Sequence, residues 1–237
     1  MPIKNNAILI SGGTGLLGKT LSTIQPDLIA PSHKEMDVTN PSSLTSALRK
    51  HTPTTFLHLA AFTSPPKIDQ EPIRALETNI IGTANVVRAC AETNTRLVYI
   101  STDYVFKGDT GMYLEDDELL PQNKYAWSKL GGECAVKLYD NSLIIRTSFT
   151  PNEFPYEKAF VDQYTSRDTV DIIAPLILKL TNSNQCGTIH VGSERKSVYD
   201  FAKSLHPDVG ELHRDDVSFQ VPYDTSLDIS KLKSLPL

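Results

Sequence analysis

Two pairs of residues place a tyrosine and a lysine four positions apart, Tyr125 with Lys129 and Tyr199 with Lys203. On a helix, side chains at this spacing share one face, so the ammonium group can stabilise a phenolate. A phenol with a pKa near 10 is a poor acid–base catalyst at neutral pH, but a cation within about 4 to 6 Å can lower a pKa by roughly 1 to 3 units. Each pair is therefore a candidate proton-transfer device.

Position along the chain favours the first pair. It opens a predicted helix over about residues 123–139, which follows a predicted buried strand over residues 96–101. Open α/β sheets bind ligands at the carboxyl ends of their strands. A hydroxyl at the end of that strand, from Ser101 or Thr102, can hydrogen-bond a carbonyl oxygen that Tyr125 protonates. The second pair has no such neighbours, so we expect it to open a surface helix.

A glycine-rich stretch, Gly12 to Gly18 (GGTGLLG), follows the first predicted strand and precedes an amphipathic helix. It fits Gly-x-x-Gly-x-x-Gly and, counted from Gly13, Gly-x-Gly-x-x-Gly. In this setting a tight turn lets backbone N–H groups and the helix N-terminus approach a pyrophosphate. The sequence therefore predicts a dinucleotide site, and a glycine-rich turn that binds nothing is the alternative.

The choice of dinucleotide depends on the residues after the second predicted strand. An NAD site usually has an acidic residue there to hold the ribose 2′-hydroxyl. Here Ser32, His33 and Lys34 fall nearest and can accept a 2′-phosphate, whereas Glu35 or Asp37 could serve the ribose. We favour NADP, with NAD as the alternative cofactor.

The elements that must position these residues alternate between strand and helix. Short runs rich in Ile, Leu and Val predict buried strands over residues 7–11, 27–31, 55–60, 96–101 and 142–147. Helical patterns lie between them, over residues 16–24, 41–50, about 69–93 and about 123–139. Asn40 and Pro41 look like the N-cap and first residue of the second helix. This order predicts an α/β fold, a Rossmann-type doubly wound parallel sheet.

The pattern weakens after about Phe149. Helices are expected over residues 169–180 and 197–205, and a strand over residues 187–192. We therefore predict a dinucleotide-binding Rossmann domain over residues 1–149. Residues 150–237 would form a small, compressed substrate-binding lobe interleaved with the end of the sheet.

The composition of the 237 residues favours a small-molecule partner. The net charge is −5 and no long basic or acidic run occurs, which argues against nucleic acid and anionic membrane surfaces. The apolar run near the N-terminus is too short for a signal peptide or a membrane span, and three widely spaced cysteines fit reduced thiols. We expect a cytoplasmic protein without a metal cluster. A homodimer stays open, and Arg146 would pair with a phosphate or a core carboxylate.

Several stretches occur together in a familiar order: GGTGLLG, HLAAFT (58–63), YISTDYVFKG (99–108) and YAWSK (125–129). With them, the chain resembles the extended short-chain dehydrogenase/reductases over nearly its whole length. Within that group it is similar to the dTDP-4-dehydrorhamnose reductase family of nucleotide-sugar metabolism. Departures are Ala126, where the family commonly has glycine, Phe149, where it commonly has tryptophan, and a compressed lobe between residues 150 and 171.

The resemblance implies roles for individual residues. Thr102 would polarise the carbonyl, Tyr125 would donate the proton, and Lys129 would lower the tyrosine pKa and hold the nicotinamide ribose. The residues expected to bind the cofactor are Gly12, Thr14, Gly15, Leu16, Leu17, Gly18, Ser32, His33, Lys34, Asp37, Val38, Leu59, Ala60, Ala61, Asn79, Tyr125 and Lys129. Those expected to bind substrate are Thr63, Thr102, Asp103, Tyr104 and Phe149. For Asn79, a helix hydrogen bond is an equal alternative.

The activity that the resemblance implies is NADPH-dependent reduction of the 4-keto group of a nucleotide-linked deoxysugar, as in dTDP-rhamnose biosynthesis. One alternative is a nucleotide-sugar epimerase or dehydratase that keeps NAD bound. Another is a non-catalytic, NADP-binding regulatory subunit resembling that of methionine adenosyltransferase.

Overall fold

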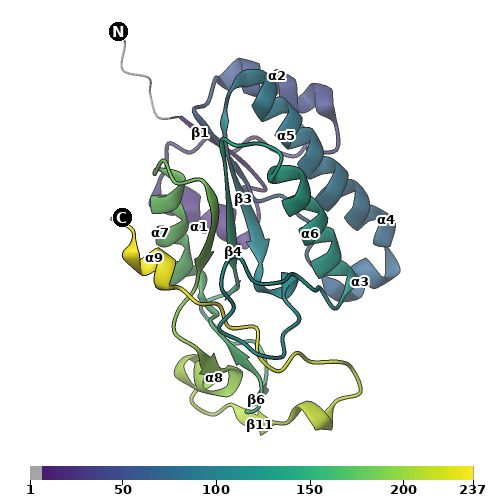
Figure 1. The fold of residues 1–237 in the computed structure, drawn as a ribbon, viewed down its shortest axis with the longest axis vertical. Helices are drawn as coiled ribbons and strands as arrows, with labels where there is room; N and C mark the ends of the chain where they lie inside the picture. The colour runs from purple at the N-terminus through teal and green to yellow at the C-terminus, as the bar shows by residue number, and fades with distance from the viewer. Residues whose placement is uncertain (1–6, 237) are drawn as a thin grey trace.

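The computed structural model describes residues 7–236 and is built around a five-stranded parallel sheet (Figure 1). The strand order is β1 (Ile8–Ser11), β2 (Thr55–His58), β3 (Arg96–Thr102), β4 (Ser142–Thr147) and β9 (Gly187–Val191). Each of these strands was predicted, and each end lies within two residues of the prediction. Residues 1–6 and 237, which belong to the two predicted domains, lie outside the described residues.

Helices cover both faces of the sheet (Figure 1). Alternate strand residues pack on one face against α1 (Leu16–Ile24), α7 (Val170–Thr181) and α9 (Ser230–Ser234). The other strand residues pack against α2 (Pro41–His51), α5 (Gly82–Thr93) and α6 (Lys124–Val136). The expected doubly wound α/β fold is confirmed. No helix within residues 7–236 has the length and apolar character needed to cross a bilayer.

The predicted strand over residues 27–31 is wrong as a strand. Only Ile29 pairs with β1, through two backbone hydrogen bonds of 2.8 and 2.9 Å. Pro26 precedes the segment and Pro31 is its last residue, and because proline has no N–H to donate, they limit the length of any ladder here. Ile29 lies on the side of β1 opposite β2, so the chain changes direction across the sheet at β1. Ligands of open α/β sheets bind at such a switch point.

The predicted long helix over about residues 69–93 is also divided. It consists of α3 (Pro65–Gln70), α4 (Pro72–Ala75), a π-helix (Leu76–Ile81) and α5. A proline stands at the start of both α3 and α4, where the missing N–H costs no hydrogen bond. Pro72 also prevents α3 from continuing. By contrast, the predicted cap of α2 is confirmed, because Asn40 accepts hydrogen bonds from two backbone N–H groups.

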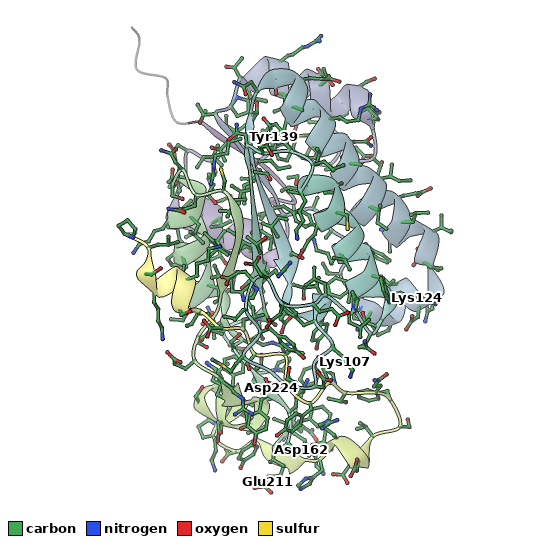
Figure 2. All side chains as sticks on the ribbon, in the orientation of Figure 1. Lys107, Lys124, Tyr139, Asp162, Glu211 and Asp224 are labelled. Atoms are coloured by element: carbon green, nitrogen blue, oxygen red, sulfur yellow. The ribbon has the colours of Figure 1, made fainter. Side chains whose placement is uncertain are left out.

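The last third of the chain contributes both to the main sheet with its helices and to a smaller group of elements beside it. β9 and α7 belong to the main layers, whereas α8 (Val198–Leu205), β6 (Lys158–Phe160) and β11 (Gly210–Leu212) lie below them in Figure 1. The labelled side chains Asp162 and Glu211 lie in this lower part in Figure 2. Two short 3-10 helices span Asp103–Val105 and Arg214–Asp216. Two pairs of two-residue strands complete the elements. In one, β5 (Phe149–Thr150) pairs with β8 (Asp168–Thr169), and in the other, β7 (Tyr164–Thr165) pairs with β10 (Lys196–Ser197). The division at residue 149 stays a prediction.

A buried ion pair fixes α6 to β4. Arg146 and Glu133 are both 0% exposed, with Nη2 of the arginine 2.9 Å from Oε2 of the glutamate. Arg146 Nε also donates to Glu133, and Nη1 donates to the carbonyl oxygen of Glu115. Of its two predicted partners, Arg146 therefore has the core carboxylate.

Arg146→Met should lower the free energy of unfolding by about 3 to 5 kcal/mol, because it leaves Glu133 as an unpaired buried charge. Adding Glu133→Leu should restore most of the loss. Urea unfolding of both variants measures this. Lys124→Met is the control: Lys124, labelled in Figure 2, makes only exposed contacts with the carboxylate and carbonyl oxygen of Asp69, so its loss should cost less than about 1 kcal/mol. A loss below about 1 kcal/mol in Arg146→Met would contradict the prediction.

Candidate active site

A cleft of about 810 Å³ lies at the carboxyl ends of the strands. It contains the glycine turn, the loop after β2, the ends of β3 and β4, and the start of α6. The predicted residues that line it are Gly12, Thr14, Gly15, Leu16, Leu17, Gly18, His33, Asp37, Val38, Leu59, Ala60, Ala61, Thr63, Thr102, Asp103, Tyr104, Tyr125, Lys129 and Phe149. Cofactor and substrate candidates thus share one continuous cleft.

Three predicted residues do not line the cleft: Ser32, Lys34 and Asn79. Ser32 is exposed, and its hydroxyl donates to Glu35 of its own turn (2.8 Å). Asn79 is 1% exposed and hydrogen-bonds both backbone groups of Phe62 and the hydroxyl of Ser128. Asn79 therefore lies behind the site and ties the loop after β2 to α6, because its amide is fully used in these contacts.

The glycine turn requires its glycines. Gly12 has a φ of 73°, and a Cβ there would lie 2.8 Å from the backbone nitrogen of Ala60. A Cβ on Gly18 would lie 2.6 Å from the carbonyl oxygen of Gly12. The N-cap residue of α1 is Gly15, which has no side chain to accept a hydrogen bond. The backbone N–H groups of the first helical turn are therefore free of a side-chain cap. This geometry fits a dinucleotide diphosphate, for which a helix N-terminus is a suitable anion site.

At the other side of the turn, Asp37 and His33 line the place expected for the adenosine ribose. His33 Nε2 lies 3.6 Å from Asp37 Oδ2. Asp37 Oδ1 accepts hydrogen bonds from the backbone and hydroxyl of Thr39. Partial burial opposes ionisation, but these hydrogen bonds hold the pKa of Asp37 below its usual range. The region thus offers a carboxylate and an imidazole, the groups that would contact a ribose or a 2′-phosphate.

Tyr125 and Thr102 meet in the cleft, as predicted. Tyr125 is half-buried at the start of α6 and lines the cleft together with Thr102 at the end of β3. Burial raises the pKa of Tyr125, and the Thr102 hydroxyl acts in the opposite direction. Thr102 Oγ1 donates to Asp103 Oδ1 (3.0 Å) and accepts from the backbone N–H of Tyr104 (3.2 Å).

Asp103 connects the end of β3 to the C-terminal segment. It is 2% exposed, and its second carboxylate oxygen accepts a hydrogen bond of 2.8 Å from the hydroxyl of Thr225. Burial raises the pKa of Asp103, while these hydrogen bonds and the charge of Arg167 act in the opposite direction. Asp103 was predicted as a substrate ligand, but in the structure its carboxylate holds Thr102 and Thr225 together.

Lys129 is held by contacts at the end of β3, and its expected lowering of the Tyr125 pKa stays a prediction. Its Nζ donates to the carbonyl oxygen of Ile100 (2.7 Å) and lies over the ring of Tyr99, 4.1 Å from the centroid. Burial raises the pKa of Tyr125, and it lowers the pKa of Lys129 to about 7, with Glu133 acting in the opposite direction. Desolvation therefore favours the neutral form of both side chains.

The second tyrosine–lysine pair lies outside the cleft. Tyr199 and Lys203 are on α8, with Nζ and the hydroxyl 3.3 Å apart at the surface. His58, by contrast, is a satisfied core histidine: it hydrogen-bonds Ser11 and Thr83, and burial lowers its pKa to about 3. Within residues 7–236 no group of three potential ligands could hold a metal ion.

Further residues line the cleft without having been predicted, among them Arg74, Ser148 and Arg167. Arg74 stacks over the ring of Phe62, 4.6 Å from its centroid, and pairs with Glu71. Arg167 comes from the weakly patterned segment between β4 and α7. No periodicity or motif marks it, so only the folded chain reveals that it belongs to the site.

A doubly wound parallel sheet, a glycine turn after β1 and a Tyr-x-x-x-Lys pair opening the helix after β3 define the short-chain dehydrogenase/reductase class. The family model described as "RmlD substrate binding domain" matches residues 6–174. The chain belongs to this family.

Individual relatives agree with this assignment. A dTDP-4-dehydrorhamnose reductase of Aggregatibacter actinomycetemcomitans is 29% identical, over 81% of this chain and 68% of that protein. One of Mycobacterium tuberculosis is 31% identical over 62% of this chain, which spans about half (51%) of that protein. The structure of a dTDP-4-dehydrorhamnose reductase of Bacillus anthracis in complex with NADP has 28% identity and a TM-score of 0.87, covering 97% of this chain and 92% of that one.

The lowered pKa of Lys129 predicts a pH dependence of stability. Its folded pKa is about 7, against about 10.4 in an unfolded chain. Between these values the unfolded state binds a proton that the folded state has released, so stability rises with pH, by up to about 1.4 kcal/mol per unit. Urea unfolding at pH 7, 8 and 9 should show this rise in the native protein and in the exposed control Lys203→Met. It should be smaller in Lys129→Met, and an equal rise there would contradict the assignment.

Proposed function

We propose that the protein reduces the 4-keto group of a nucleotide-linked deoxysugar with NADPH. The observation that carries this proposal is the convergence of the glycine turn, Thr102 and Tyr125 on one cleft. The relatives named dTDP-4-dehydrorhamnose reductase support the same substrate class. Arg167, from the predicted lobe over residues 150–237, completes the cleft beside Ser148 and Phe149, which supports a substrate-binding role for that lobe.

The cofactor, when bound, supplies a hydride to the ketone carbon. The chain's own part is to bind the diphosphate at the start of α1, to place the ketone beside Tyr125 and to deliver a proton. The named complex of a family member with NADP supports this choice of cofactor. Lys129 would hold the ribose next to the nicotinamide, in reach of the end of β3.

Tyr125 has the protonation state that a general acid needs. Its raised pKa keeps the phenol protonated at neutral pH, and an alkoxide that develops on the ketone oxygen is more basic still and takes the proton. Thr102, which now donates to Asp103, would polarise the ketone after its hydroxyl turns toward the ligand. Proton transfer from a positioned group of this kind contributes about 10²- to 10⁴-fold in rate.

Two alternatives use the same fold. An epimerase or dehydratase would regenerate its bound NAD, and a regulatory subunit would bind NADP without turnover. Net oxidation of NADPH in the presence of a dTDP-4-keto-6-deoxysugar, followed at 340 nm in the purified protein, is expected only for the reductase.

Tyr125→Phe should lower turnover by about 10²- to 10⁴-fold, because it removes the proton donor. The dissociation constant of NADPH should stay within about twofold, since the glycine turn is untouched. Steady-state kinetics and NADPH fluorescence titration measure the two quantities. Tyr199→Phe, in the pair outside the cleft, is the matched control with native turnover. Native turnover in Tyr125→Phe would refute the proposal.

His33→Glu should raise the KM for NADPH by about tenfold or more and that for NADH much less. A carboxylate there repels the 2′-phosphate and removes a charge-assisted contact. Lys34→Glu is the comparison, and because Lys34 does not line the cleft, its effect should be smaller. Equal losses with NADPH and NADH in His33→Glu would remove His33 from 2′-phosphate recognition.

A further inference from the structure

Arg167 lies in the cleft at a distance from the glycine turn. It lines the cleft beside Ser148 and Phe149, which follow β4, and Tyr104, which follows β3. The glycine turn follows β1, and the strand order puts β4 three strands away from it. At about 4.8 Å per strand the separation is roughly 14 Å. Arg167 and the turn therefore cannot hold the same pair of phosphates.

The arginine is held in place before any ligand arrives. Its backbone N–H donates to the hydroxyl of Thr165 (3.0 Å), and its carbonyl oxygen accepts from the hydroxyl of Ser193 (3.2 Å). Its side-chain Nε donates to the hydroxyl of Ser148 (3.0 Å). A half-buried guanidinium that is anchored at Nε loses little conformational entropy when its terminal nitrogens bind a ligand.

Within residues 7–236, the guanidinium of Arg167 makes no direct ion pair. Arg146 is paired with Glu133 and Arg195 with Asp224, but in the described part of the chain no carboxylate oxygen lies within 4.0 Å of Arg167. Its charge does act on the buried Asp103, whose pKa burial raises and Arg167 helps to lower, but the two form no direct ion pair. A half-buried cation without a direct ion pair is only partly compensated. The planar guanidinium matches phosphate oxygens bidentately, so an anionic ligand group would complete the site.

We propose that Arg167 binds the diphosphate of the nucleotide-linked substrate. This inference rests on the proposed function, because it assigns the substrate's anionic group to one end of the cleft that the cofactor shares. The ketone would then lie between two anion sites, the backbone N–H groups of the turn for the cofactor and the guanidinium for the substrate. Arg167 is thus a specificity-determining residue for nucleoside diphosphates.

The test is calorimetric titration of thymidine diphosphate, inorganic pyrophosphate and thymidine into the purified protein saturated with NADP. Arg167→Met should weaken thymidine diphosphate and pyrophosphate by about 10- to 100-fold, since hydrogen bonds to charged groups are lost. Thymidine should bind both proteins equally. Arg167→Lys, which keeps the charge without the planar fork, should show an intermediate loss.

The matched control is Arg74→Met, which removes a cation from the same cleft but one already paired with Glu71. Arg74→Met should weaken thymidine diphosphate binding by less than about threefold. A loss equal to that in Arg167→Met would indicate a general electrostatic effect of positive charge in the cleft instead of a specific contact. The proposal is overturned by native affinity for thymidine diphosphate in Arg167→Met, by loss of NADP affinity in that variant, or by no thymidine diphosphate binding to the native protein. Failure of the native protein to oxidise NADPH would refute the proposed function and leave the binding result standing.

Discussion

Close packing of α6 on β3 and β4 is the constraint on which the site depends. Gly132 permits the approach, because a Cβ there would lie 2.4 Å from the hydroxyl of Tyr99. One residue later, Glu133 pairs with Arg146 of β4 in the core. The helix is therefore fixed in both depth and rotation, and its first two turns bring Tyr125 and Lys129 to the end of β3. A loosely packed helix would leave the same pair without a defined partner.

The sequence predicts the parts of the fold whose signals are local. Buried parallel strands are short apolar runs, and the cap at Asn40 and the glycine turn each depend on residues within one turn of the chain. The segment over residues 27–31 has the apolar composition of a strand but only one paired residue, because two prolines limit the ladder. The interruption by Pro72 shows the converse, that one imino acid overrides a helical pattern around it.

Site residues that belong to a local sequence pattern could be predicted. Site residues that only tertiary contacts bring to the cleft could not. Tyr125 and Tyr199 have the same spacing to lysine, and their places relative to β3 separate them. Asn79 lies on a helix behind the cleft but does not line it, because its amide hydrogen-bonds the backbone of Phe62 in the loop after β2. Arg167 could not be predicted, since Thr165, Ser193 and Ser148 fix it through contacts from three separate segments.

Burial governs the chemistry of the cleft in one direction. It favours the neutral forms of Tyr125 and Lys129. A protonated phenol is what a ketone reduction consumes, and an anionic ligand brings the negative charge that would return a proton to Lys129. The same desolvation that costs stability at Lys129 thus makes its charge depend on what the cleft holds.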